Sequence, residues 1–215
     1  VEPGEIVGLL GANGAGKTTA FYMTVGLVQP DAGEVYFGGE RVTALPMCKR
    51  ARMGMGYLSQ EPSVFRPLTV EENLLCALEV VESRRKPRMA LLEKLLEELH
   101  LTPLAKKPAS ALSGGERRRL EITRALATSP SCLMLDEPFA NIDPLSIAEV
   151  QALIRLLADR GIGILITDHN AREIFSTVHR SYLVREGRIL KAGTVEELVD
   201  DPTVRKFYLG EDFRW

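Results

Sequence analysis

Short apolar runs alternate along this chain with segments in which apolar residues recur at helical spacing. Continuous runs without regular polar alternation predict strands buried on both faces, and they lie at 6–10, 55–58, 132–135 and 162–167. Two further runs flank Glu186 and Gly187, which predicts a hairpin. Because strands alternate with helices, we expect an α/β fold with a mostly parallel sheet, helices on both faces and a small antiparallel edge.

The middle of the chain carries only helical patterns. From Thr69 to about Leu101 the spacing predicts helices, with one apolar stripe formed by Leu91, Leu92, Leu95, Leu96 and Leu99. Helix starts are predicted by the capping boxes Thr69/Glu72 and Ser113/Glu116, and by Asp143 before Pro144. We therefore expect one domain over 1–215, with a helical lobe at about 68–124 inserted into a core of 1–67 and about 125–215.

Composition narrows the class of protein. Apolar residues make up 45% of the 215 residues and charged residues 26%, which is ordinary for a soluble globular chain. The net charge of −2 argues against a general nucleic-acid binder. The charge-free stretches fall short of the roughly 20 apolar residues that span a bilayer.

The cysteines and the basic clusters are interpreted as structural features and not as functional sites. Cys48, Cys76 and Cys132 are far apart and odd in number, which disfavours a disulfide framework or a zinc site and predicts buried or half-buried side chains in a reducing compartment. Basic clusters stand at 49–52, 84–88 and 117–119. Because acids balance them nearby, we expect solvated helix faces; contact of 84–88 with anionic headgroups is the weaker alternative.

The first chemical motif is the segment Gly11–Thr18, which matches GxxxxGK[ST] between a predicted strand and a predicted helix. Glycines allow backbone N–H groups to surround phosphates, and the helix adds its positive N-terminal end. Lys17 can reach the β- and γ-phosphates, and the Thr18 hydroxyl can bind Mg²⁺. The other phosphate-binding candidates are Gly11, Asn13, Gly14, Ala15, Gly16 and Thr19. The loop alone leaves GTPases, kinases and many ATPases open.

Two adjacent acids end a second buried strand. Asp136 and Glu137 follow the apolar run 133–135. At the end of such a strand Asp136 can hold the Mg²⁺ shell, and Glu137 can polarise an attacking water. The alternative is that both acids are merely solvated at a strand end, but this would leave the apolar run directly before them unexplained.

A third motif, Leu112–Glu116 (LSGGE), resembles the signature of ABC ATPases. Other family positions follow in the family's order, namely Gln60 after a strand, Asp143 and His169. The resemblance covers essentially the whole chain and implies an enzyme that hydrolyses ATP with Mg²⁺. It also implies a homodimer in the ATP-bound state, in which Ser113, Gly114 and Gly115 of one copy close the site of the other.

The same resemblance assigns the remaining roles. It implies that Gln60 senses Mg²⁺ and the lytic water, that His169 contacts the γ-phosphate, and that Asp143 lies in a loop crossing the dimer. A chain without spans is expected on the cytoplasmic face of the inner membrane, docked to two transmembrane permease subunits near Gln60–Leu68. In that segment Phe65 is either an apolar anchor or a core residue.

Several stretches are similar to the ATPase subunits of lipopolysaccharide exporters; they are 57–61, 112–121, 136–140, 167–170 and the tail 208–214. This similarity implies that ATP hydrolysis powers extraction of lipopolysaccharide from the inner membrane through separate membrane subunits. Two alternatives stay open: the ATPase of a branched-chain amino-acid importer, and a soluble ABC ATPase that acts on ribosomes or DNA.

The chain departs from the family pattern at three places. Ser59 stands where close relatives usually have Pro, and Asn141 where they often have Gly. Only ten residues precede Gly11, whereas family members carry an adenine-stacking aromatic residue further upstream. We therefore expect that this residue and at least one edge strand are absent from the sequence, which would lower nucleotide affinity.

Overall fold

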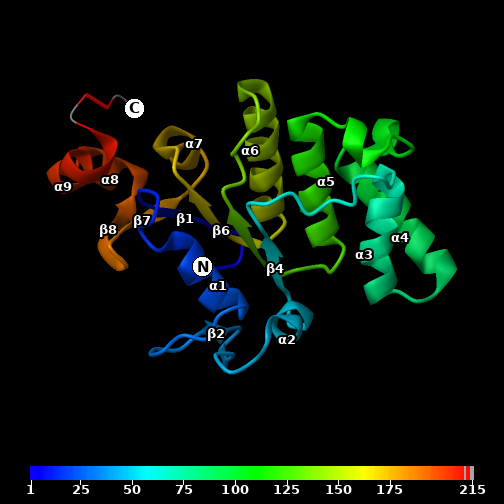
Figure 1. The fold of residues 1–215 in the computed structure, drawn as a ribbon, viewed down its shortest axis with the longest axis horizontal. Helices are drawn as coiled ribbons and strands as arrows, with labels where there is room; N and C mark the ends of the chain where they lie inside the picture. Colours follow the sequence, from blue (N-terminus) through cyan, green and yellow to red (C-terminus); the bar gives the residue numbers. More distant parts are fainter. Residues whose placement is uncertain (211, 214–215) are drawn as a thin grey trace.

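A six-stranded sheet crosses the middle of the molecule in the computed structural model, which describes residues 1–210 and 212–213 (Figure 1). Its strands, in spatial order, are β4 (Met55–Leu58), β5 (Cys132–Asp136), β6 (Gly163–Asp168), β1 (Ile6–Leu10), β7 (Arg180–Arg185) and β8 (Arg188–Thr194). All neighbours are parallel except β7 and β8, which form the predicted hairpin. A separate antiparallel pair consists of β2 (Tyr36–Phe37) and β3 (Glu40–Arg41). The predicted fold class is confirmed.

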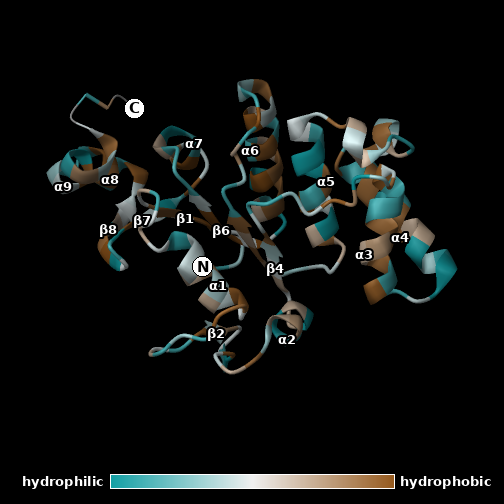
Figure 2. Ribbon diagram, in the orientation of Figure 1, coloured by the Kyte–Doolittle hydropathy of each residue, from teal (hydrophilic) through white to brown (hydrophobic). Residues whose placement is uncertain are grey.

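Helices cover both faces of this sheet. On one face, α1 (Lys17–Val25) packs its Phe21 and Val25 against Met55 and Met134. On the other face, α6 (Pro144–Asp159), α7 (Ala171–Phe175) and α8 (Val195–Asp200) bury apolar side chains with Leu133. Figure 2 shows the central strands β1 and β6 as hydrophobic, as expected for strands buried on both faces. The remaining core helices are α2 (Met47–Arg52), α9 (Pro202–Val204) and the π-helix Arg205–Leu209.

The middle segment forms a group of helices with its own hydrophobic cluster. It comprises α3 (Val70–Val81), α4 (Arg85–Glu98), short 3₁₀ turns at Thr102–Leu104 and Ala109–Ala111, and α5 (Gly114–Leu126). Leu74, Leu78, Leu92, Leu96 and Leu120 belong to that cluster. The boundaries of a lobe at about 68 and 124 stay a prediction.

The helical pattern from Thr69 to Leu101 is divided between two helices. Glu82 is extended, and its carboxylate accepts hydrogen bonds from the main chain and guanidinium of Arg84, which fixes the turn. Leu92, Leu96 and Leu99 are buried, whereas Leu91 is 39% exposed. The capping boxes at Thr69 and Ser113 and the Asp143 cap are present as predicted.

Two expectations about burial were wrong. Cys48 and Cys76 are exposed, and only Cys132 is partly buried. Within the basic clusters Arg50 is 1% and Arg118 6% exposed, so neither belongs to a solvated face. A guanidinium group can be buried when carbonyl and carboxylate oxygens meet its five N–H donors.

Arg50 shows how such burial positions the phosphate-loop helix. It donates hydrogen bonds to the carbonyls of Met23 and Thr24 at the C-terminal end of α1, at 2.8 and 2.5 Å. It also donates to the carbonyls of Thr43 and Leu45, both at 2.8 Å. Burial lowers the pKa of the guanidinium, which stays charged because the ordinary value is so high. One side chain thus ties α1 to the segment that leads into α2.

Replacing Arg50 by Met should lower the free energy of unfolding by about 3 kcal/mol, because four partly buried carbonyls lose a charged donor. Urea unfolding followed by circular dichroism measures this change. Arg52→Met, at an exposed position of the same helix, is the control and should change stability by less than about 0.5 kcal/mol. Equal stability of the two variants would contradict the structural role of Arg50.

Candidate active site

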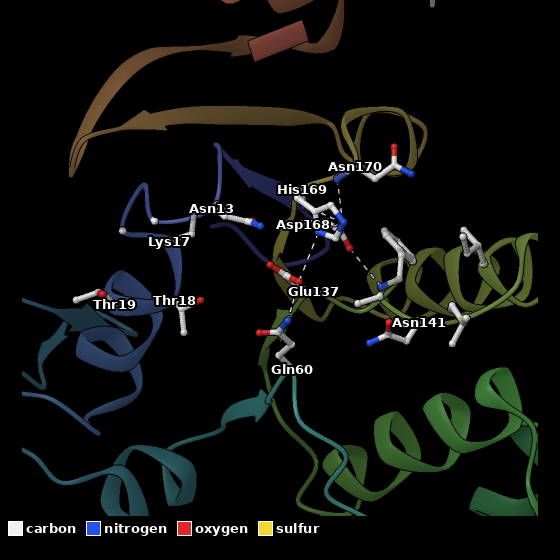
Figure 3. A pocket seen from close by; sticks show the side chains of 16 residues that line it. Asn13, Lys17, Thr18, Thr19, Gln60, Glu137, Asn141, Asp168, His169 and Asn170 are labelled. Carbon is white, nitrogen blue, oxygen red and sulfur yellow. Dashed lines mark hydrogen bonds and ion pairs between the residues drawn. The ribbon is translucent and has the colours of Figure 1, made fainter. Parts of the chain in front are cut away.

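A cleft of about 730 Å³ opens at the carboxyl edge of the sheet (Figure 3). The loops that follow β1, β4, β5 and β6 meet there, the edge at which parallel sheets bind ligands. Nine site residues predicted from the sequence line this cleft, namely Asn13, Gly14, Gly16, Lys17, Thr18, Thr19, Gln60, Glu137 and His169. The fold therefore brings together residues as far apart in the sequence as Asn13 and His169.

The phosphate loop has the backbone shape that its glycines predict. Gly14 has φ 79° and Gly16 φ 103°, in the region where a Cβ atom is disfavoured. Gly16 directly precedes α1, and the first helical turn, whose N–H groups have no partner within a helix, lines the cleft with Lys17, Thr18 and Thr19. This arrangement suits an anion such as a polyphosphate.

Lys17 is held against this loop. Its side chain is only 5% exposed, and Nζ donates hydrogen bonds to the carbonyls of Gly11 and Ala12 at 2.8 and 3.2 Å. The β7–β8 hairpin supports the loop from the other side, because the N–H of Gly187 donates to the Ala15 carbonyl at 3.0 Å. The ammonium group is thus fixed at the wall of the cleft.

Asp136 and Thr18 have the chemistry expected of a Mg²⁺ site. Asp136 is 1% exposed, and its Oδ1 accepts a hydrogen bond from the Thr167 hydroxyl at 2.5 Å. Its Oδ2 is buried and has no hydrogen-bond partner among the described residues, while the partly buried Thr18 lines the cleft. Mg²⁺ in nucleotide sites takes one or two protein oxygens plus phosphate and water. The Thr18 hydroxyl and the unpaired Asp136 carboxylate oxygen fit that donor set chemically, but Asp136 is not among the residues that line the cleft.

Glu137 is the point on which the polar side chains converge. Its Oε2 accepts a hydrogen bond from Gln60 Nε2 at 2.9 Å and lies 3.5 Å from Nδ1 of His169 (Figure 3). Its φ of 47° is unusual for a residue other than glycine. The N–H of Glu137 donates to the carbonyl of Thr167 at 2.9 Å, which helps to hold this conformation.

Asp168 orders the loop that carries His169. It is 1% exposed, and its Oδ1 accepts hydrogen bonds from the N–H groups of His169 and Asn170 at 2.8 and 3.0 Å. Its Oδ2 accepts from the N–H of Phe139 at 3.4 Å, which connects this loop to the one after β5. The Tyr208 hydroxyl donates to the His169 carbonyl at 3.3 Å, and burial, together with the charge of Asp168, raises the pKa of that tyrosine.

Thr167 and Asp168 belong to the site although they were not predicted from the sequence. Both are polar residues at the end of an otherwise apolar strand, the same signal that identified Asp136 and Glu137. Asp168 lines the cleft, and so do six further residues that were not assigned to the site from the sequence, namely Phe139, Ala140, Asn141, Ile142, Ile147 and Asn170. Of these, Asn141 has φ 59°, a left-handed conformation that asparagine tolerates better than most residues other than glycine.

The signature residues do not line this cleft. Ser113 is exposed at the start of α5, where its Oγ accepts from the Glu116 N–H at 3.2 Å, and the Glu116 carboxylate accepts from the Ser113 N–H at 2.8 Å. That backbone hydrogen bond lowers the pKa of Glu116. At Gly115 a Cβ atom would overlap the Ser146 side chain, so only glycine fits.

Asp143 also lies outside the lining of the cleft. Its carboxylate caps α6, accepting hydrogen bonds from the Ser146 N–H at 3.1 Å and from the Ser146 hydroxyl at 2.6 Å. These contacts lower the pKa of Asp143. Within one chain it is a helix cap, and its role in a dimer stays a prediction.

The segment Gln60–Leu68 presents an aromatic side chain to solvent. Phe65 is 49% exposed, and the guanidinium group of Arg124 lies 5.0 Å from its ring centre. The buried Asn73 holds the backbone beneath it, accepting from the Phe65 N–H at 2.8 Å and donating to its carbonyl at 3.0 Å. Phe65 is therefore not a core residue. Across residues 1–210 and 212–213, no helix combines the length and hydrophobicity that a bilayer crossing requires.

Comparisons with known proteins identify the family of this chain. The ABC transporter family profile matches residues 1–140. The "Lipopolysaccharide export system ATP-binding protein LptB" of Acidithiobacillus ferridurans is 56% identical over 214 residues, covering 100% of this chain and 89% of the relative. The protein of the same name from Escherichia coli K12 is 48% identical over 215 residues, with the same coverage.

A solved structure with the same fold supports this family. The ADP conformation of MJ1267, an ATP-binding cassette of an ABC transporter, superposes with a TM-score of 0.86 at 28% identity, covering 97% of this chain and 89% of that one. The chain belongs to the ABC transporter family, as an ATP-binding subunit that hydrolyses ATP.

Proposed function

We propose that this chain is the ATPase subunit of a lipopolysaccharide export system, which powers extraction of lipopolysaccharide from the inner membrane through separate membrane subunits. The observation that carries this proposal is the 56% identity to a lipopolysaccharide-export ATP-binding protein along the whole chain. The alternatives of a branched-chain amino-acid importer and of a soluble ATPase on ribosomes or DNA find no support in the comparisons.

In this proposal the phosphates of ATP lie along Gly11–Thr19, with Lys17 on the β/γ oxygens. Thr18, Asp136 and Gln60 hold Mg²⁺, which neutralises phosphate charge when bound. Glu137 takes the proton of the attacking water, and Gln60 and His169 orient that water and the γ-phosphate. The buried Asp168 keeps His169 in place through the backbone.

Two copies complete each other's sites. Ser113, Gly114 and Gly115 lie at the N-terminal end of α5, where free N–H groups and a hydroxyl can meet an anion. Since they do not line the cleft of their own chain, we place them against the γ-phosphate of a second copy, with Asp143 in the loop crossing the dimer. ATP then holds the homodimer closed, and hydrolysis releases it.

The membrane partners in this proposal are two transmembrane permease subunits, which hold the chain on the cytoplasmic face of the inner membrane. They dock near Gln60–Leu68, where the exposed Phe65 ring provides an apolar anchor and Arg66 a charged contact. The same segment begins with Gln60, so docking and hydrolysis share one stretch of chain.

Glu137→Gln should lower steady-state phosphate release by at least about 100-fold, because the amide cannot accept the proton of water. ATP binding persists, so the variant should accumulate as an ATP-bound dimer in size-exclusion chromatography. Glu97→Gln, at an exposed position of α4, is the control. Near-normal phosphate release from Glu137→Gln would remove Glu137 from the role of base.

Copurification tests the membrane partners. The tagged chain should capture a pair of membrane subunits from solubilised membranes, and Phe65→Ala should reduce that capture by at least about 10-fold, as expected for a central aromatic anchor. Phe207→Ala is a matched control, because Phe207 is 46% exposed and also lies against an arginine, Arg185.

Depletion of the chain should leave lipopolysaccharide in the inner membrane. Absence of any captured pair, or normal lipopolysaccharide export after depletion, would contradict the proposal.

A further inference from the structure

Arg118 lies in α5, just after the signature residues, with only 6% of its surface exposed. All five of its guanidinium N–H donors are used. Nε donates to the Pro138 carbonyl at 3.0 Å, Nη1 to the Ser59 carbonyl at 3.3 Å and to Glu121 Oε2 at 3.0 Å, and Nη2 to the carbonyls of Asp136 at 3.2 Å and Glu137 at 2.9 Å. Four of the five acceptors are thus main-chain oxygens at the end of β5 and in the loops after β4 and β5.

Glu121 fixes the orientation of this guanidinium group. It lies three residues further along α5 and is 4% exposed. One carboxylate oxygen pairs with Arg118, and the other accepts a hydrogen bond from the N–H of Ser63 at 3.1 Å. The pair therefore reaches from the end of β5 to the segment Gln60–Leu68.

The contact with the Glu137 carbonyl acts on a residue in an unfavourable backbone conformation. At φ 47° Glu137 is held from both sides: Thr167 binds its N–H, and Arg118 binds its carbonyl. Arg118 also donates to the carbonyl of Ser59, the residue directly before Gln60. Gln60 and Glu137 are the two side chains joined at 2.9 Å in the cleft, so one guanidinium fixes the backbone beneath both.

We propose that Arg118, oriented by Glu121, is a positioning residue for ATP hydrolysis that sets the placement of the Glu137 carboxylate relative to Gln60. Through the hydrogen bond of Glu121 to Ser63 it also connects that placement to the docking segment, a consequence that rests on the proposed function. Neither residue lines the cleft or needs to touch the nucleotide.

A purely structural ion pair is the competing explanation. Buried ion pairs can often be replaced by apolar residues of similar volume without loss of stability. The acceptors of Arg118 argue for more than packing, because they belong to the loops after β4 and β5 that carry Gln60 and Glu137. Loss of a purely structural pair would leave kcat per binding site unchanged, whereas loss of a positioning pair would lower it.

The test uses the full-length chain with the variants Arg118→Lys and Glu121→Gln. Lysine offers three donors on a single nitrogen, which cannot span the five acceptors of Arg118, and glutamine keeps the shape of Glu121 without its charge. We expect kcat per ATP-binding site to fall by about 10- to 100-fold, with KM for ATP within about two-fold of the parent value. Titration with a fluorescent ATP analogue counts the binding-competent sites, which corrects for any loss of folded protein.

Glu149→Gln is the matched control, because Glu149 pairs with Arg119 of the same helix but lies at an exposed position. It should leave kcat and KM unchanged. The double variant Arg118→Met/Glu121→Met separates the two explanations further: it should melt closer to the parent than Glu121→Gln does, yet remain as slow as Arg118→Lys.

Three outcomes would overturn the proposal: an unchanged kcat per binding site in Arg118→Lys and Glu121→Gln, a rise in KM alone, or a double variant that regains the parent kcat. These measurements use the chain without membrane partners. Failure to capture such partners would therefore count against the proposed function, but it would not affect the conclusion that Arg118 and Glu121 position Glu137.

Discussion

Parallel pairing of four adjacent strands is the constraint on which the whole site depends. β4, β5, β6 and β1 all end at the same edge of the sheet, so the loops that follow them meet in one cleft. Burial on both faces fixes the register of these strands, because a slip of one residue would turn apolar side chains to the opposite face. These strands thereby place the phosphate loop, Gln60, Glu137 and His169 relative to one another.

Motifs at strand ends could be predicted from the sequence because their physical signals are local. An apolar run followed by glycines or acids identified the phosphate loop, Asp136 and Glu137, and capping residues identified the starts of α3, α5 and α6. Thr167 and Asp168 carried the same signal in front of His169. They were not assigned to the site, because what they do depends on contacts with Asp136, Glu137 and the His169 backbone that form only in the folded chain.

The buried arginines could not be predicted in this way. Arg50 and Arg118 stand in basic runs that are typical of solvated helix faces, and their burial depends on carbonyl oxygens from distant segments. Those acceptors come together only in the folded chain. The exposure of Cys48, Cys76 and Phe65 likewise depends on which neighbours the fold supplies, and periodicity does not encode it.

The signature residues lie outside the cleft of their own chain, and the proposed homodimer requires that one chain, despite a complete phosphate loop and acid pair, supplies only part of each working site. The ATPase activity of a mixture of two variants tests this claim most directly. Lys17→Ala removes the phosphate contact, and Ser113→Asp keeps a good helix cap while placing negative charge where the second copy's phosphate would lie. Each variant alone should be inactive, and mixing them should restore activity, because one site of a mixed dimer has both parts intact. Activity no greater than the sum of the separate variants would contradict a site shared between two copies.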